Sequence, residues 1–106
     1  MDAFRLTYPT AMVLQALDAG QRYGFEIADT TGLRPGSVYQ VLRRLEAHGL
    51  VTGAWENAEI AHGEGRPPRR YYRLRARSAA GVLAEARRRY PALEIVVAQL
   101  RGESPA

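Results

Sequence analysis

The sequence has 106 residues, of which 46% are hydrophobic and 25% charged, so it suits one folded domain and excludes a largely disordered chain. No apolar run approaches the roughly 20 residues that span a bilayer, and no secretory signal is expected at the N-terminus. Cysteine is absent and the two histidines, His48 and His62, are far apart, so we expect a cytoplasmic protein without a metal or another cofactor.

Positive charge is concentrated in the middle of the chain. The formal net charge is +4, and every one of the 15 basic residues is arginine. Residues 34–77 hold nine arginines against four glutamates, whereas residues 1–33 hold two arginines against four acids. A genome that favours arginine would explain the lack of lysine but not this clustering. The distribution is typical of a nucleic-acid-binding face, because arginine offers a planar fork for phosphate or guanine.

Two helices are predicted in the first third of the chain. Apolar residues at helical spacing, with Pro9 in the first turn, predict a helix over 9–17. A shorter helix is predicted over 24–31, with Gly32 as its C-cap. The apolar residues of the second helix that we expect to be buried are Phe25, Ile27 and Ala28.

The third helix carries the clearest pattern. Pro35 lies near its start, and His48-Gly49 ends it, with Gly49 suited to a left-handed backbone. Its apolar side chains fall on one stripe that should face the core. The stripe consists of Val38, Tyr39, Leu42 and Leu45.

A hairpin is predicted after the third helix. Residues 50–56 and 70–75 have strand character, and the polar, Gly- and Pro-rich segment 57–68 between them is predicted to be a loop. Regular alternation along the second strand would direct Tyr72 and Leu74 to the core. The order helix, helix, helix, strand, loop, strand, helix predicts an α+β, mainly α, winged helix-turn-helix fold.

In this fold the third helix enters the major groove of DNA, and its apolar stripe determines which residues face outward. Gln can pair with adenine and Arg with guanine, while Ser can serve a phosphate or a base edge. Val41 is expected on this outward face as well. The candidate DNA-binding residues of the helix and its entry are Arg34, Gly36, Ser37, Gln40, Arg43 and Arg44.

The hairpin adds a second set of candidate DNA contacts. Pro67 and Pro68 stiffen the chain, so nearby charges lose less entropy when they bind the DNA backbone or its minor groove. The candidates in the hairpin are Arg66, Arg69, Arg70 and Arg73.

Residues 23–51 (YGFEIADTTGLRPGSVYQVLRRLEAHGLV) and 65–74 (GRPPRRYYRL) resemble the PadR family of transcriptional regulators. The resemblance covers about residues 6–75. It implies a homodimer that binds a pseudo-palindromic operator, usually as a repressor, with a small-molecule effector in some members. It also implies a DNA contact for the hydroxyl group of Tyr39. The Leu-Thr-x-x-Gly turn common in the family is absent after Leu74, and the C-terminal region has the short form with one helical segment.

The terminal segment, 78–101, is predicted to be helical, with a kink at Pro91 or two helices that meet at Tyr90. Its apolar residues form a heptad-like seam, which favours helix pairing between two copies, with packing on its own domain as the alternative. We therefore divide the chain into a DNA-binding domain, 1–77, and a dimerisation helix with a short tail, 78–106. The candidate dimerisation residues are Leu83, Ala86, Tyr90, Leu93, Val97 and Leu100.

Other functional classes have weaker support. An enzyme is not expected, because no nucleophile has an evident basic partner and no phosphate-binding loop is present. A winged helix that binds protein instead of DNA remains the alternative, although Arg43 and Arg44 on the third helix speak against it. A small-molecule effector also stays open. The aromatic residues proposed to line a pocket for it are Phe4, Tyr8, Tyr23 and Trp55.

Overall fold

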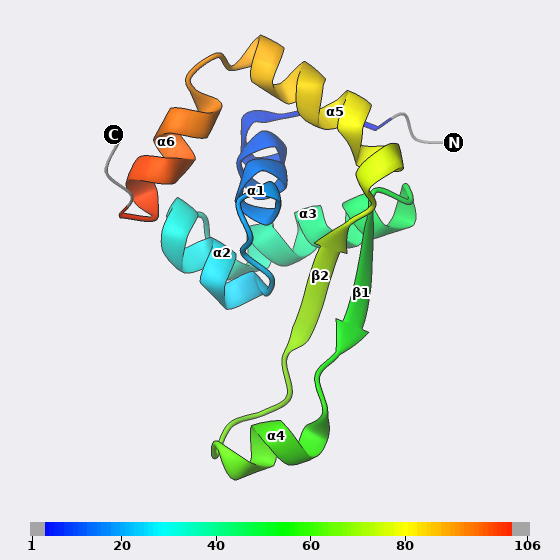
Figure 1. Cartoon of the computed structure of the whole chain (residues 1–106), viewed down its shortest axis with the longest axis vertical. Coiled ribbons are helices and arrows are strands. Elements are labelled where there is room, and N and C mark those ends of the chain that lie inside the picture. The colour runs from blue at the N-terminus through cyan, green and yellow to red at the C-terminus, as the bar shows by residue number, and fades with distance from the viewer. Residues whose placement is uncertain (1–3, 103–106) are drawn as a thin grey trace.

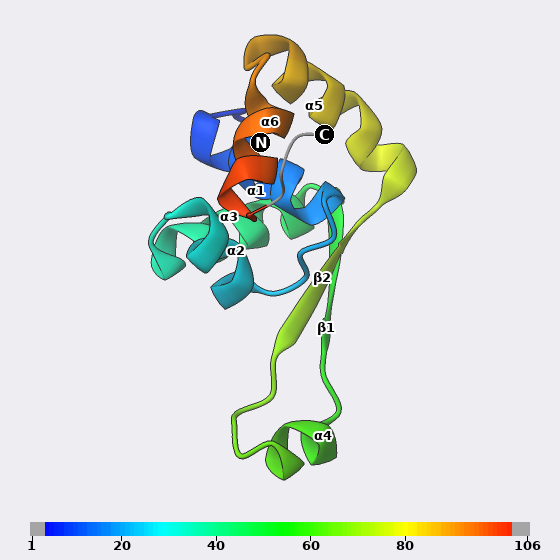
Figure 2. The same ribbon diagram turned by 60° about the vertical axis from the view of Figure 1, so that its left-hand side comes forward.

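In the computed structural model, which describes residues 4–102, a β-hairpin projects from a helical body and carries a short helix at its far end (Figure 1). The second view shows the same long projection (Figure 2). No helix within residues 4–102 is long and apolar enough to cross a membrane. The elements are, in chain order, α1 (Tyr8–Asp18), α2 (Gly24–Thr31), α3 (Pro35–Ala47), β1 (Val51–Trp55), α4 (Ala58–Gly63), β2 (Arg70–Leu74), α5 (Ala76–Arg89) and α6 (Leu93–Leu100).

The first three helices follow the sequence signals closely. Thr7 caps α1 by accepting a hydrogen bond from the Thr10 backbone N–H at 3.3 Å. Gly32 ends α2 with φ +77°, and Gly49 follows α3 with φ +71°. Both angles lie in the left-handed region where a side chain is strained, so these two glycines place the turns on either side of α3. The three predicted helices are confirmed.

The hairpin pairs β1 and β2 in antiparallel register, from Val51 opposite Leu74 to Trp55 opposite Arg70. A further backbone contact joins β2 to the body, where the Tyr72 N–H donates to the Arg22 carbonyl at 2.7 Å. Tyr72 is buried, so the predicted alternation along β2 is confirmed. The wing therefore starts from a fixed position beside α2.

The prediction of a plain loop over 57–68 is wrong, because the segment contains α4. The Asn57 side chain caps this helix by accepting from the Glu59 N–H at 2.7 Å, and Ala61 is fully buried. The glycines and prolines that end and follow this short helix, from Gly63 to Pro68, hid the capping signal in the sequence.

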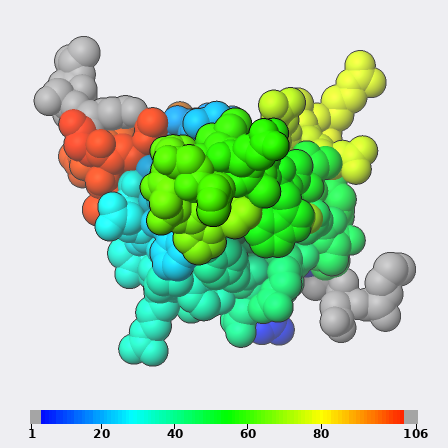
Figure 3. Space-filling model, turned by 90° about the horizontal axis from the view of Figure 1, so that it is seen from below, coloured from blue at the N-terminus to red at the C-terminus, as the bar shows by residue number. Residues whose placement is uncertain are grey.

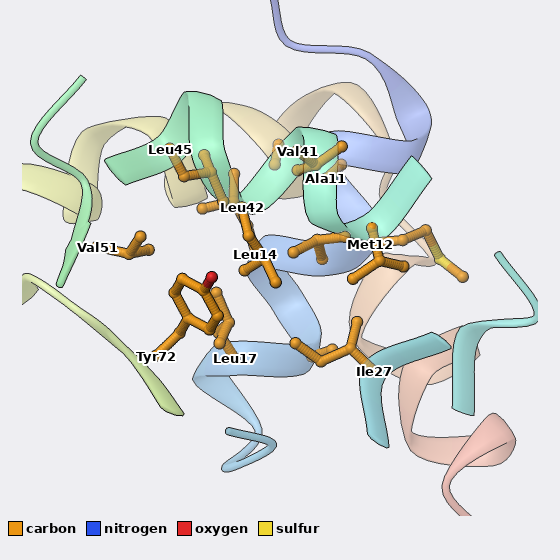
Figure 4. Close-up of a cluster of buried hydrophobic side chains, with 14 of the residues drawn as sticks. Ala11, Met12, Leu14, Leu17, Ile27, Val41, Leu42, Leu45, Val51 and Tyr72 are labelled. Carbon is orange, nitrogen blue, oxygen red and sulfur yellow. The ribbon is translucent and has the colours of Figure 1, made fainter. Parts of the chain in front are cut away.

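The core forms around α1, which is buried over most of its length (Figure 4). Side chains from α2, α3 and the hairpin close around it. Labelled members of this cluster are Ala11, Met12, Leu14, Leu17, Ile27, Val41, Leu42, Leu45, Val51 and Tyr72.

The terminal segment forms two helices rather than one. α5 ends at Arg89 with Tyr90 as its C-cap, and α6 begins at Leu93 after Pro91, as the second of the two predicted geometries requires. The apolar seam packs largely on its own domain, which was the alternative to pairing between copies. Tyr90 is half-buried and Leu100 is exposed, but Leu83, Ala86, Leu93 and Val97 are buried in the chain's own core.

Arg87 ties the terminal helices to α1. Its guanidinium group lies 3.0 Å from Gln15 Oε1, 2.7 Å from an Asp18 carboxylate oxygen and 3.2 Å from a Glu94 carboxylate oxygen. One side chain thus bridges α5, α1 and α6. Contact between two copies through the four buried seam residues would require these helices to leave their own domain.

Candidate nucleic-acid interface

α3 exposes one strip of side chains on the side of the helix opposite its buried stripe. Val38, Leu42 and Leu45 are buried as predicted, but Val41 is only 7% exposed, so its predicted place on the outward face is wrong. With Val41 buried and Tyr39 half-buried, the apolar stripe is wider than the one we expected, and this leaves a narrower outward face. The exposed residues of that face are Gly36, Ser37, Gln40, Arg43 and Ala47, with Arg44, which is exposed as well, at its edge.

Two arginines of this region are free to bind a ligand. Arg34, the N-cap residue of α3, and Arg43, in its third turn, are both exposed. Neither side chain makes a hydrogen bond or an ion pair within residues 4–102. Their charge is therefore uncompensated, and both guanidinium groups keep all their donors for an incoming acceptor.

Arg44 belongs to a different flank of the helix. Its Nη2 donates to the hydroxyl oxygen of Thr10, a fully buried residue of α1, at 3.0 Å. Glu46 lies on the opposite flank, where its carboxylate accepts from Arg70 Nη2 of the wing at 2.9 Å. The strip with Gln40 and Arg43 runs between these two flanks.

Tyr39 is half-buried at the junction of α2, α3 and the wing. A Cβ atom on Gly24 would lie only 2.5 Å from Tyr39 Cε1, so glycine at this position allows the ring to pack against α2. Burial, and to a lesser extent Tyr72, raises the pKa of Tyr39. The phenol therefore stays protonated, and its O–H remains a hydrogen-bond donor.

The arginines in the stem of the wing brace it against the body. The Arg69 guanidinium lies 4.3 Å from the centre of the Tyr23 ring, in cation–π geometry. Arg70 pairs with Glu46 and lies 5.6 Å from the Trp55 ring centre. The Arg73 side chain, by contrast, is exposed and has no hydrogen bond or ion pair in the described part of the chain.

Arg66 holds the tip of the wing together. Its guanidinium donates to both carboxylate oxygens of Glu56, at 2.5 and 2.8 Å, and to Glu64 at 2.9 Å. The Arg69 backbone N–H and the Tyr71 hydroxyl also donate to Glu56. The hydrogen bond from Arg66 is the main cause that lowers the pKa of Glu56 to about 2. Glu56 and Glu64 therefore compensate the charge of Arg66 within the protein.

A cleft of about 950 Å³ separates the wing stem from α2 and α3, and it is rich in aromatic residues. Tyr23 and Tyr39 line it together with Phe25, which is 64% exposed, so the predicted burial of Phe25 is wrong. Trp55, 67% exposed, also lines it. Phe25 lies next to the buried face of α2 rather than on it, and the short helix gave no clear period to show this.

The four aromatic residues proposed for an effector pocket do not come together. Tyr23 and Trp55 line the cleft beside the wing, whereas Phe4 lines a second cleft near the end of α3. The Tyr8 ring packs edge-on against Tyr90, with centres 5.1 Å apart. Among residues 4–102, no three or more His, Cys, Asp or Glu side chains are grouped to hold a metal ion.

The three helices and the hairpin, with polar and cationic side chains on the outer face of α3, define a winged helix-turn-helix protein. A sequence profile described as "Transcriptional regulator PadR-like family" matches residues 13–79. The chain belongs to this family of transcriptional regulators.

A solved structure supports the same assignment. The crystal structure of a PadR family transcription regulator from hypervirulent Clostridium difficile R20291 is similar, with a TM-score of 0.65 and 25% sequence identity. The match covers 91% of this chain and 100% of the other. No curated protein matches the chain significantly.

Proposed function

We propose that the protein is a sequence-specific DNA-binding regulator whose helix α3 reads base edges in the major groove. The exposed strip of α3 carries this proposal, because Gln40 and Arg43 lie on it and Arg43 has no partner in the described part of the chain. A Gln side chain can bind adenine and an Arg side chain guanine with two hydrogen bonds each. Arg34, Gly36 and Ser37 lie at the start of the helix, where they serve the DNA backbone.

In this proposal the wing contributes contacts to the phosphate backbone. Arg73 has the free charge for such a contact, and Arg69 keeps its guanidinium donors while it stacks on Tyr23. The Tyr39 hydroxyl, held at the cleft, donates to a phosphate oxygen. Arg66 and Arg70 act indirectly, since they fix the wing through Glu56 and Glu46.

We further propose that the regulator is a homodimer that represses transcription from a pseudo-palindromic operator. Two-fold symmetry would place two α3 helices about one turn of DNA apart. Two large apolar side chains of α6, Ile95 at 59% and Leu100 at 48% exposure, support a contact between copies. The division into a DNA-binding part, 1–77, and a dimerisation part, 78–106, belongs to this proposal.

The rest of the proposal follows from this role. The protein acts in the cytoplasm, binds double-stranded DNA and has no catalytic role or cofactor. An effector, if the protein has one, does not use the four-residue aromatic pocket that the sequence suggested, because those side chains lie in different places.

Selection of bound sequences from a random pool of duplex DNA tests the central claim. We expect one enriched site with two inverted half-sites, and loss of one base preference in the Arg43→Ala variant. Light scattering of the free protein at micromolar concentration should give the mass of a dimer. Binding that enriches no sequence and persists only at low salt would leave a non-specific DNA-binding protein. A strict monomer would contradict the dimer alone.

A further inference from the structure

A second cleft, of about 780 Å³, lies between the N-terminal segment, the end of α3 and the end of α5. Arg5, Arg44 and Arg89 come from these three places, and all three line it with His48 and Phe4. None of the described residues that line it is acidic. In Figure 3 the blue atoms of the first described residues emerge beside the end of α3 at the lower edge of the molecule. We call this group the N-terminal basic cleft.

Neutral acceptors hold two of the three arginines in the N-terminal basic cleft. Arg44 donates to the Thr10 hydroxyl at 3.0 Å, and Arg89 donates to the Leu6 carbonyl at 2.9 Å. Arg89 also lies 3.3 Å from a carboxylate oxygen of Glu85, so its charge is partly compensated. Arg5 is exposed and has no hydrogen bond or ion pair within residues 4–102. The cleft is thus ordered largely without loss of its positive charge.

This arrangement differs from the other arginine clusters of the protein. Arg66, Arg70 and Arg87 each pair with a carboxylate that serves the fold. The three arginines of the N-terminal basic cleft have only the Glu85 carboxylate beside Arg89 as an acidic partner among the described residues. The remaining positive charge suits an anion, most of all the tetrahedral oxygens of a phosphate.

The position of the cleft relative to α3 indicates which phosphate it meets. Arg44 leaves α3 on the flank opposite Glu46 and the wing. An α-helix, about 10–12 Å across with its side chains, fills a major groove about 12 Å wide, and a sugar–phosphate backbone forms each wall of that groove. With α3 in the groove, the wing therefore lies along one backbone and the N-terminal basic cleft along the other.

We propose that the N-terminal basic cleft binds a phosphate group of the DNA strand that the wing does not reach. The proposal rests on the DNA-binding function proposed above. It assigns Arg44 to the backbone rather than to base edges, and it adds Arg5 and Arg89, which the sequence did not single out. Together with the wing, the cleft would grip both strands around α3.

The salt dependence of binding to a random-sequence duplex tests this site. Arg5→Ala removes a charge without breaking a described contact, and Arg5→Ala/Arg44→Ala removes two. Loss of the one phosphate contact proposed here should reduce the slope of log affinity against log salt concentration by about 0.9, in part in Arg5→Ala and in full in the double variant. Arg77→Ala is the matched control, because Arg77 is exposed in the first turn of α5 and does not line the cleft. The control should leave the slope unchanged.

The outcomes separate the cleft from the proposed function. Equal loss of slope in Arg5→Ala and Arg77→Ala would mean an effect of net charge and would overturn the site. An unchanged slope in the cleft variants, with a reduced slope in Arg73→Ala, would overturn the cleft but leave DNA binding by the wing. If the wild-type protein binds no duplex, the proposed function fails. An NMR titration with inorganic phosphate then decides the cleft: shifts of Arg5 and Arg44 signals would mean free phosphate as its ligand, and their absence would overturn the site.

Discussion

The arginines of α3 and those of the wing come from the same basic stretch of sequence, but the structure uses them differently. Arg34 and Arg43 are exposed and unpaired within the described residues, whereas Arg66 and Arg70 are bound to glutamates. An arginine already paired in the protein must give up that pair before it neutralises a phosphate, so it adds less to DNA affinity than a free one. A count of positive charges along the sequence therefore overstates the wing as a DNA-binding element.

The largest expected effect is on DNA binding, where an exposed arginine of α3 can be compared with a paired arginine of the wing. Arg43→Ala should weaken binding to the selected site by about 1–3 kcal/mol, roughly 5- to 150-fold, and relax the preference at one base pair. Arg66→Ala should leave every base preference unchanged, because its guanidinium is occupied by Glu56 and Glu64. Competition binding with single-base variants of the site measures both. A changed base preference in Arg66→Ala would contradict the claim that the paired arginines of the wing do not contact bases.

The second prediction concerns the fold of the wing tip. Glu56→Gln keeps the shape of the side chain but removes the charge that Arg66 holds, together with its acceptor for Arg69 or Tyr71. We expect faster amide hydrogen exchange in α4 and unchanged exchange in α1. Glu59→Gln is the control, because its exposed carboxylate makes no hydrogen bond or ion pair in the described part of the chain. Equal effects of the two substitutions would show that the buried pair does not hold the tip.

The same pair makes the tip sensitive to acid. The pKa of Glu56 is lowered from 4.5 to about 2 in the folded protein, chiefly by Arg66. A lowered pKa contributes stability that is complete above the ordinary value and is lost as the pH falls from about 4.5 towards 2. Hydrogen exchange in α4 should accelerate across this interval in the wild-type protein. In the Glu56→Gln variant, hydrogen exchange in α4 should not show this acceleration at low pH.

Local sequence signals explain which elements of the fold could be predicted. The helices α1 to α3 have periodic apolar residues and glycines after their C-terminal ends, and the two strands are rich in apolar residues, so local signals were enough to predict them. α4 was missed because glycine and proline follow closely after its six residues. The inward side of Val41 was missed although Val38, Val41, Leu42 and Leu45 follow the helical period, because the expected stripe held Tyr39 in place of Val41.

The residues of the candidate site also divide into those that local sequence signals identified and those that they did not. The sequence identified the exposed face of α3 through Gln40 and Arg43, because their exposure follows from the helical stripe. It did not separate Arg66 and Arg70 from Arg73, because the glutamates that bind them lie 10 and 24 positions away. The sequence also gave no sign that Arg5 and Arg89, which are 84 positions apart along the chain, line one cleft. Pairing across such distances is set by the fold.

A smaller effect is expected when Arg73 is removed, because its side chain makes no hydrogen bond or ion pair within residues 4–102. Arg73→Ala should lower the salt slope of DNA binding by about 0.9 and weaken all sequences alike, because a phosphate contact carries no sequence information. Fluorescence anisotropy over a salt series, with a selected and a scrambled duplex, measures this. A loss confined to the selected duplex would show that Arg73 reads bases.

The smallest effect should come from Gly53, which lies opposite Tyr72 in the hairpin. A Cβ atom at this position would lie 2.8 Å from Arg70 Nη2, so in Gly53→Ala the end of the Arg70 side chain must move away from Glu46. The lost ion pair is partly exposed and should cost about 0.5 kcal/mol of unfolding free energy. Restriction of the unfolded chain by alanine contributes about 0.4–1 kcal/mol in the opposite direction. The single substitution is therefore nearly silent, and the coupling between positions is the informative quantity.

Denaturant unfolding of Gly53→Ala, Glu46→Gln and the double variant measures that coupling. Glu46→Gln should destabilise the wild-type protein slightly and have no effect in the Gly53→Ala background, where Arg70 is already displaced. The coupling should also shrink in high salt, as expected for a half-exposed ion pair. Strict additivity would mean that Arg70 does not brace the wing against α3. The guanidinium would then be available to DNA, and the contrast between the two sets of arginines would weaken.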